Sequence, residues 1–177
     1  MTVVLLIGGS VRSGSVNQAV LATAADLTPD GVTVRRYEGL AELPQFNPDL
    51  DAYPLPAPVE HLRNAIAEAS ALLFSTPEYA GTMPGALKTL LEWTVGGVEI
   101  SHKPCGWINP STGPTHAVAT YATLRTVLGY TGAAVVPEAC ADVPITRDLI
   151  GHDGTITDAG ARDAIGRVMR ELVARAE

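Results

Sequence analysis

The stretch LLIGGSVRSGSVNQAVLATAADL, residues 5–27, decides how the chain is organised. It opens as a short apolar run that ends at Gly8 and Gly9, which is typical of a buried strand. From Ser15 to Leu27 the apolar residues follow the spacing of a helix. A strand that enters a helix through a bare, hydroxyl-rich turn is the first half of an α/β unit. The start of such a helix carries N–H groups that have no partner.

The same alternation continues along the chain. Short apolar strands are predicted at 2–8, 32–36, 71–75, 104–109 and 132–137, and helical spacing at 15–27, 59–66, 83–95, 118–128 and 165–173. Strands that alternate with helices imply a parallel sheet covered on both faces. We therefore predict an α/β, flavodoxin-like doubly wound sheet of five strands in the order 2-1-3-4-5. Only the strand at 32–36 alternates apolar and polar residues, which indicates an edge strand. We expect one domain over residues 1–177.

Composition excludes several classes of function. The chain has 12 basic and 19 acidic residues, a net charge of −7, and no basic run, which argues against nucleic acid as a partner. No segment approaches the roughly 18 apolar residues of a membrane span. Cys105 and Cys140 lie far apart, and the four histidines are scattered, so neither a disulfide framework nor a metal site is expected. We expect a cytoplasmic protein.

Three polar loops that contain glycine each follow a predicted strand, at 8–17, 76–85 and 109–116. In a parallel sheet these loops lie at the same edge, outside the carboxyl ends of the strands, where ligands bind. We therefore expect the three loops to meet in one site.

The first loop suits a terminal phosphate. Gly8 and Gly9 would let a ligand approach the backbone, Ser10, Ser15 and Asn17 offer short donors, and Arg12 can bind an anion through two nitrogens. The alternative is that Ser15 only caps the helix while Arg12 is solvated. The loop matches neither the dinucleotide fingerprint nor the P-loop motif.

The second loop suits a flat heteroaromatic ring. Backbone groups from Tyr79 to Gly81 could pair with such a ring, and Tyr79 could pack against it. We predict that Thr82 caps the helix that follows. The alternative is a plain turn with Tyr79 in the core.

Two segments, GSVRSGSVN at 9–17 and PEYAGTMPGALKTLLEW at 77–93, resemble the NADPH-dependent FMN reductase family of flavodoxin-like proteins. That family includes quinone, chromate and azo-dye reductases, and LPQFNPDLD at 43–51 is similar to its connection before the second helix. The resemblance implies an enzyme that passes hydride from NADPH or NADH through bound FMN to a small acceptor by a ping-pong mechanism. The acceptor would be a quinone, free flavin, azo dye or metal oxyanion. The resemblance also implies that the flavin and no side chain carries the chemistry, and that the protein is a homodimer or homotetramer.

The resemblance assigns cofactor contacts residue by residue. The positions that match the family's phosphate and ribityl contacts are Ser10, Arg12, Ser15, Val16 and Asn17. The positions that match the loop along the isoalloxazine are Pro77, Glu78, Tyr79, Ala80 and Gly81, with Ser111, Thr112 and Gly113 as further ring-side candidates.

The chain also departs from the family pattern. Ala80 replaces the usual Asn, Thr82 the usual small hydroxyl residue, and Thr89 the usual Asn after Lys88. We expect these changes to affect flavin affinity more than the fold. Glu78 and Lys88 are expected to form a charge pair that stiffens the loop.

Two other classes of function stay open. A non-enzymatic electron carrier would shield its flavin with aromatic residues, which make up only 5% of this chain. A glycosyl-bond hydrolase or transferase with Glu78 as nucleophile would need a second carboxylate within about 5–10 Å.

Overall fold

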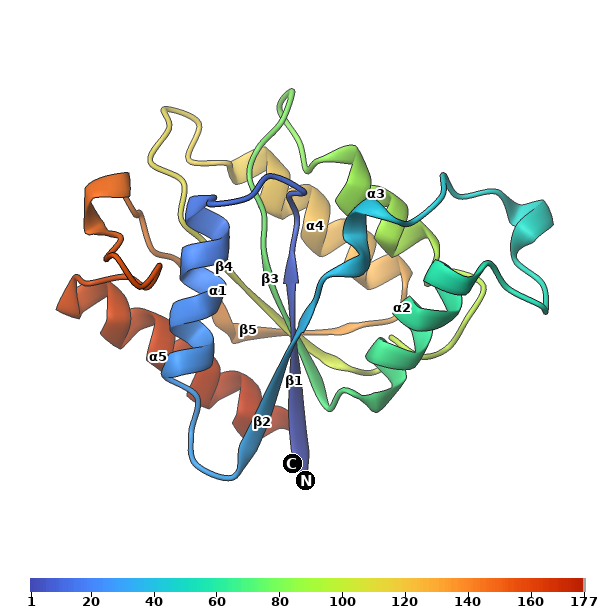
Figure 1. Ribbon diagram of the computed structural model, residues 1–177, viewed down its shortest axis with the longest axis horizontal. Coiled ribbons are helices and arrows are strands. Elements are labelled where there is room, and N and C mark those ends of the chain that lie inside the picture. The colour runs from blue at the N-terminus through green and yellow to red at the C-terminus, as the bar shows by residue number, and fades with distance from the viewer. Residues whose placement is uncertain (177) are drawn as a thin grey trace.

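The computed structural model describes residues 1–176 as five strands and five α-helices in strict alternation (Figure 1). The elements in chain order are β1 Thr2–Gly8, α1 Val16–Asp26, β2 Val32–Tyr37, α2 Ala57–Glu68, β3 Ala71–Ser75, α3 Gly85–Glu92, β4 Pro104–Asn109, α4 Val118–Tyr130, β5 Ala134–Asp142 and α5 Ala159–Ala176. Short 3-10 turns lie at Gly39–Ala41, Pro48–Leu50 and Arg147–Leu149.

All five strands are parallel, in the order β2-β1-β3-β4-β5. This confirms the predicted flavodoxin-like topology, including the edge position of β2. The connection that leaves β1 through α1 goes to one side of the sheet, and the one that leaves β2 through α2 returns past β1 to β3. The order therefore reverses at β1 and β3, and a crevice is expected outside their carboxyl ends.

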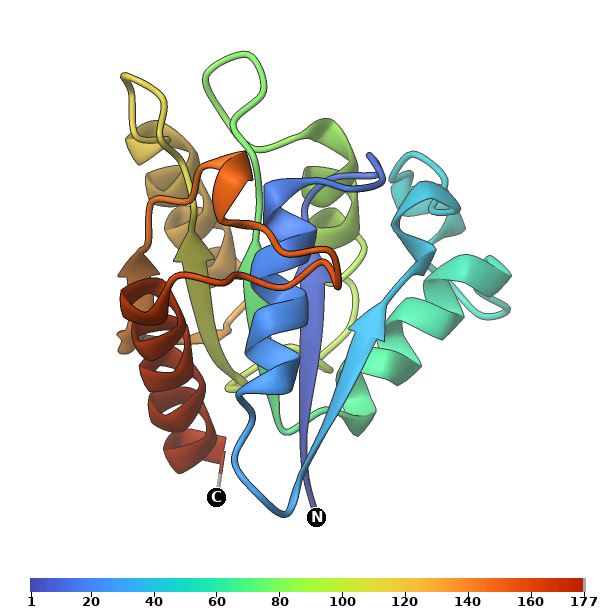
Figure 2. The same ribbon diagram turned by 60° about the vertical axis from the view of Figure 1, so that its left-hand side comes forward.

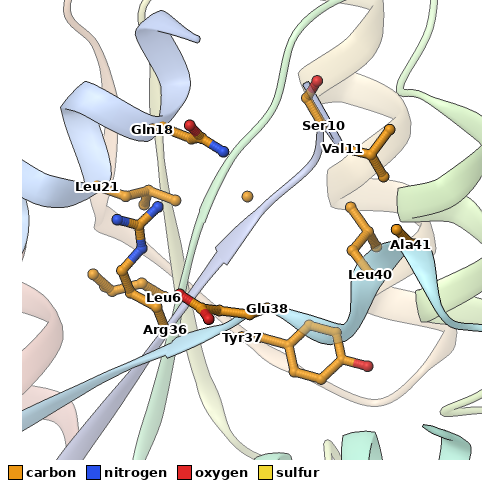
Figure 3. Close-up of a pocket in the computed structure, with 11 residues that line it drawn as sticks. Leu6, Ser10, Val11, Gln18, Leu21, Arg36, Tyr37, Glu38, Leu40 and Ala41 are labelled. Carbon is orange, nitrogen blue, oxygen red and sulfur yellow. The ribbon is translucent and has the colours of Figure 1, made fainter. Parts of the chain in front are cut away.

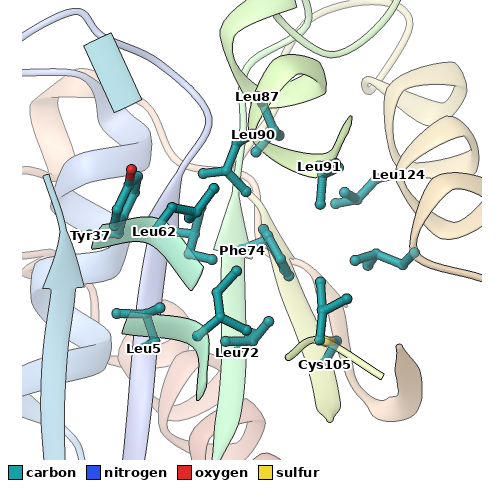
Figure 4. Packing of buried hydrophobic residues seen from close by; sticks show 14 of the residues in the cluster. Leu5, Tyr37, Leu62, Leu72, Phe74, Leu87, Leu90, Leu91, Cys105 and Leu124 are labelled. Atoms are coloured by element: carbon teal, nitrogen blue, oxygen red, sulfur yellow. The ribbon is translucent and has the colours of Figure 1, made fainter. Parts of the chain in front are cut away.

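Two apolar cores fill the space between the sheet and its helices. Leu5, Leu72 and Phe74 pack against α2, α3 and α4 on one face (Figure 4). Val4, Leu6 and Leu73 pack against α1 and α5 on the other, and Figure 2 shows these two helices side by side. Successive strand residues thus alternate between the two cores, as the side-chain period of two requires.

The structure corrects the predicted bounds of α3 and β5. α3 begins at Gly85 after Pro84, so Thr82 is not its cap, and Val95 lies beyond the helix with 64% of its surface exposed. Strand β5 is longer than predicted, since it continues through Pro137 to Asp142 past a bulge opposite β4. Proline is tolerated there because β5 is an edge strand.

The long connection between β2 and α2 is anchored to the body of the protein. Arg63 on α2 forms an ion pair of 2.6 Å with Asp51, and both side chains are less than a tenth exposed. Its guanidinium also donates to the carbonyl of Trp93, whose indole donates to the Pro44 carbonyl. Within residues 1–176, no helix has the length and hydropathy needed to cross a membrane.

Candidate functional site

The loop from Gly9 to Ser15 leads into the N-terminus of α1. Ser15 caps the helix, since its hydroxyl accepts from the Gln18 N–H at 3.2 Å. The first two helical N–H groups, of Val16 and Asn17, have no intrahelical acceptor and carry the positive end of the helix dipole. Arg12 is exposed and forms no ion pair within the described part of the chain. Ser15 therefore caps the helix and Arg12 is solvated, as the alternative interpretation expected, and the Ser15 hydroxyl still has its own proton to donate.

A buried hydroxyl fixes this loop to the two strands beside it. The Ser75 Oγ, at the end of β3, lies 2.9 Å from both the Asn17 Oδ1 and the Ile108 carbonyl, and its single proton serves the two acceptors. The Asn17 oxygen is thereby turned inward, which leaves its amide N–H₂ as the group that is free to donate. Asn17 is thus held as a donor.

Gly9 packs directly against the second loop. A Cβ at this position would lie 2.0 Å from the Thr76 Oγ1. The Gly9 N–H also donates to the Ser75 carbonyl at 2.9 Å. The structure therefore gives this glycine a packing role, and its predicted role in ligand approach stays a prediction. Its missing side chain lets the first loop lie directly against the second.

The second loop is a tight two-residue turn. Tyr79 and Thr82 exchange backbone hydrogen bonds of 2.8 and 3.2 Å, and the two residues between them have positive φ, 52° at Ala80 and 78° at Gly81. Positive φ at both central residues defines a type I′ turn, for which Asn-Gly is the favoured pair. Ala80 therefore occupies a conformation that an alanine adopts at a cost of about 1–2 kcal/mol.

Side chains of this second loop reach both neighbouring loops. The Tyr79 hydroxyl lies 3.2 Å from the Ser10 hydroxyl in the first loop. The Glu78 carboxylate accepts from the Thr115 hydroxyl in the third loop at 3.0 Å. The predicted charge pair between Glu78 and Lys88 is wrong, because the Lys88 ammonium pairs with Glu92 one helical turn along α3. Tyr79 is half-exposed, so it is not part of the core.

The third loop is braced from beneath by Asn109, the last residue of β4. Its amide N–H₂ donates to the His116 carbonyl and to Asp142, and its oxygen accepts from the Ser111 N–H at 3.1 Å. Asn109 is buried, so these bonds are shielded from water. They hold Ser111 and the residues after it in a defined arc.

The loops enclose a cavity of about 380 Å³. Of the predicted residues, those that line it are Val16, Asn17, Pro77, Glu78, Ser111, Thr112 and Gly113. Ser10, Arg12, Ser15 and the turn at 79–81 are not among its lining residues. The three loops therefore converge as predicted. The predicted residues form two groups, one that lines the cavity and one that lies at the N-terminus of α1 and at the loop tips.

Several residues that organise the site were not predicted. Tyr121, on α4, accepts from the Thr76 N–H and its hydroxyl lies 3.0 Å from the carbonyls of Thr76 and Ile108. Burial raises the pKa of Tyr121, so its hydroxyl stays protonated. Ser75, Asn109 and Thr115 were also missed. A polar residue at the end of a predicted apolar strand was the available signal for the first two, whereas nothing local marks Thr115 or Tyr121.

Comparisons with known proteins agree with this arrangement. A family model described as NADPH-dependent FMN reductase matches residues 1–146. The chain is 32% identical to an NAD(P)H-dependent FMN reductase of Pseudomonas aeruginosa, over 96% of this chain and 92% of that protein. It is 29% identical to a quinone reductase of Escherichia coli, over 88% and 85%. In fold it is similar to FerB, a flavoenzyme NAD(P)H:(acceptor) oxidoreductase of Paracoccus denitrificans, with a TM-score of 0.88 and 24% identity over 99% and 97% of the two chains.

Proposed function

Because the chain belongs to the NADPH-dependent FMN reductase family, we propose that its three loops hold FMN and that a small acceptor is reduced there by a ping-pong mechanism. The chain is an FMN-dependent NAD(P)H oxidoreductase, with NADPH or NADH as electron donor. The residues that hold the flavin, the class of acceptor and the kinetic order are the proposed parts.

The first loop fits the phosphate of FMN. The N–H groups of Val16 and Asn17 lie at a helix N-terminus, where anions are favoured by about 0.3–2 kcal/mol. The exposed Arg12 adds a cation that can form two parallel bonds with phosphate oxygens. Ser10 and Ser15 add hydroxyl donors on either side. This donor set has no carboxylate of its own to repel the anion, which supports its assignment to the phosphate.

The cavity fits the ring end of the cofactor. Its lining combines Pro77, Ser111 and Gly113 with polar groups from all three loops. The segment 76–78, just before the tight turn, and the arc after Asn109 border it from two sides. The single observation that carries the proposal is this one cavity, shared by three loops and adjoining the anion-binding end of α1.

The chemistry of the site belongs to the cofactor. When bound, FMN accepts hydride from the nicotinamide and passes the electrons to the acceptor. The loops would orient the ring through their backbone groups, and the Glu78–Thr115 and Ser10–Tyr79 contacts fix the positions of those loops. Donor and acceptor would use the same open side of the cavity in turn, which supports the ping-pong order.

The two alternative classes find less support. Among the described residues that line the cavity, Glu78 is the only carboxylate, and it already accepts from Thr115. A glycosyl-bond hydrolase requires a pair of carboxylates. The lining also contains no aromatic residue, whereas an electron carrier would shield its flavin with aromatic side chains. A flavin ring that is left accessible to a second substrate favours a reductase over an electron carrier.

A quinone is the acceptor class that we propose first, since the relatives include quinone reductases. Free flavin, azo dyes and metal oxyanions are the remaining candidates. We further propose a homodimer or homotetramer, which light scattering after gel filtration tests directly. Both cysteines are free thiols, which supports the proposed cytoplasmic location.

The proposal is tested by the absorption spectrum of the purified protein, reconstituted with FMN and titrated without oxygen. Addition of NADPH or NADH should bleach the flavin band, and addition of a benzoquinone should restore it. Steady-state rates at several fixed quinone concentrations should give parallel double-reciprocal lines. A protein that binds no FMN, or whose spectrum is unchanged by both donors, would overturn the proposal.

A further inference from the structure

A second cavity lies on the other side of the first loop, between the carboxyl ends of β1 and β2 (Figure 3). Its volume is about 210 Å³. Leu6, Leu21 and Leu40 form its floor, and Ser10 of the first loop lies at its rim. Neither the flavin phosphate loop nor the ring cavity accounts for this space.

A cation projects into this cavity from the edge strand. Arg36 lies on β2 and its guanidinium points toward Leu21 and Gln18 (Figure 3). The side chain is exposed and forms no ion pair within residues 1–176. The preceding residue, Arg35, belongs to the opposite face of the strand and pairs with Glu68 on α2. Two adjacent arginines are thus divided between a structural pair and the cavity.

An acceptor and a donor complete the polar side of the cavity. Glu38, the first residue after β2, points into it, and no ion pair joins its carboxylate to Arg36 among the described residues (Figure 3). The oxygen of Gln18 accepts from the Gly14 N–H at 2.9 Å, so its N–H₂ is the group that is free to face the cavity. The cavity therefore offers a cation, a carboxylate and an amide donor above an apolar floor.

These residues are of the types that contact the adenosine ribose in dinucleotide-binding folds. In a strand–loop–helix–strand unit, a carboxylate at the end of the second strand can accept from the 2′-hydroxyl of an adenosine ribose, and a nearby arginine can bind a 2′-phosphate. Here β1, α1 and β2 form that unit, and both residue types stand at the end of β2. The flavin occupies the crevice on the other side of β1, so this end of the unit is left for a different nucleotide.

Resting on the proposed function, we propose that this cavity binds the adenosine ribose of the nicotinamide coenzyme and that Arg36 and Glu38 read its 2′ position. Glu38 accepts from the 2′-hydroxyl of NADH, and Arg36 binds the 2′-phosphate of NADPH. Because both side chains are present, the enzyme uses both coenzymes. The balance between NADPH and NADH is set by these two residues.

The cavity is close enough to the flavin site for one coenzyme to span both. The Ser10 hydroxyl at the cavity rim lies 3.2 Å from the hydroxyl of Tyr79, which belongs to the ring-side loop. A nicotinamide at the open face of the ring, near Tyr79, can thus continue over Ser10 and Val11 into the cavity. Because the proposed function assigns the N–H groups of Val16 and Asn17 to the flavin phosphate, the diphosphate of the coenzyme would pass outside the loop.

The test compares Arg36→Gln, Glu38→Gln and the matched control Arg35→Gln, which removes the neighbouring charge on the opposite face of the strand. We expect Arg36→Gln to lower kcat/KM for NADPH about tenfold and to leave that for NADH within about twofold, the scale of one charged hydrogen bond. Glu38→Gln should act in the opposite sense and lower kcat/KM for NADH by about fivefold. Arg35→Gln should not change the ratio. Equal losses for both donors, or no change in the ratio for Arg36→Gln, would overturn the proposal.

Calorimetric titration with adenosine 2′,5′-bisphosphate gives a readout that does not depend on catalysis. The wild-type protein should bind this probe about tenfold more tightly than Arg36→Gln, while Arg35→Gln should bind it like the wild type. Failure of flavin binding with intact binding of the probe would reject the proposed function and keep the coenzyme cavity. Normal flavin reduction with no Arg36-dependent binding of the probe would reject the coenzyme cavity and keep the proposed function.

Discussion

The carboxylate of Glu78 and the hydroxyl of Thr115 lie 3.0 Å apart, although 37 residues separate them in the chain. Glu78 belongs to the loop after β3 and Thr115 to the loop after β4, so this bond closes the ring cavity across its two walls. The shape of the proposed flavin cavity is therefore set by a contact within the protein.

Loss of this bond should loosen the cavity. We expect Thr115→Val, which keeps the side-chain shape, to weaken binding of FMN and of riboflavin alike by about 1 kcal/mol, or about fivefold in Kd. Fluorescence titration of the apoprotein measures both. Thr126→Val is the matched control, because Thr126 is exposed on α4, away from the cavity, and its hydroxyl donates to the Ala122 carbonyl of its own helix. Equal effects of the two substitutions would contradict the assigned role of Thr115.

Arg12 should act on the phosphate alone. Arg12→Ala is expected to weaken FMN binding by about 1.5–3 kcal/mol, hence tenfold or more in Kd. Arg12→Lys should recover only part of this loss, since an ammonium cannot form the two parallel bonds of a guanidinium. Riboflavin, which has no phosphate, serves as the control ligand and should bind both variants like the wild type. A parallel loss of riboflavin affinity would place Arg12 elsewhere in the site.

The turn at Ala80 should respond to substitution in a fixed order. Asn tolerates the positive φ of 52° better than Ala, and a β-branched residue tolerates it least. We expect Ala80→Asn to raise the free energy of unfolding by about 0.5–1 kcal/mol and Ala80→Val to lower it by about 1 kcal/mol or more. Urea denaturation of the apoprotein measures both. Any other order of Asn, Ala and Val would mean that the turn is not of this type.

The buried pair of Arg63 and Asp51 should dominate the stability of the β2–α2 connection. Arg63→Leu leaves a carboxylate unpaired in a dry environment and the Trp93 carbonyl without its donor, at a cost of about 3 kcal/mol. Arg35→Gln breaks the exposed pair with Glu68 and should change the free energy of unfolding by less than about 1 kcal/mol. Equal losses in the free energy of unfolding for the two substitutions, measured by urea denaturation, would contradict the argument that burial makes the Arg63–Asp51 pair the more important one.

Thiol labelling should depend steeply on pH. Burial raises the pKa of Cys140 to about 11 and also raises the pKa of the fully buried Cys105. Because the thiolate is the reactive form, iodoacetamide should label Cys140 first, at a rate that rises about tenfold per pH unit from pH 8 to 10. The folded protein keeps a proton that the unfolded chain loses near pH 9, so this contribution to stability is lost as pH rises from 9 to 11. Peptide mapping gives the order, and in urea both cysteines should react alike.

The layout of the fold follows closely from local sequence. Apolar runs such as residues 71–75, bounded by polar residues, identify the strands, and their alternation with helices leaves few topologies. Ser10, Arg12 and Asn17 could likewise be placed at the N-terminal end of α1, because the start of a helix after a buried strand fixes where such residues lie.

The contacts between loops could not be read in the same way. Glu78 has Lys88 at a plausible spacing in the sequence, yet Lys88 lies one helical turn from Glu92 and pairs there. The choice of Thr115 as the partner of Glu78 depends on how the third loop folds back over Asn109. The role of Gly9 depends similarly on Thr76, which belongs to a different strand end. Such pairs are decided by tertiary packing and leave no periodic trace in the chain.

The Ser75 hydroxyl at the end of β3, shared between Asn17 and Ile108, joins the start of α1 to the ends of β3 and β4. Together with the Ser10–Tyr79 and Glu78–Thr115 contacts, it holds the binding loops in place without help from a bound ligand. Few residues of such an apoprotein need to become ordered when the flavin binds. The kinetics of flavin binding should therefore show a single second-order phase. Apoprotein from which the flavin has been removed should bind it again without refolding.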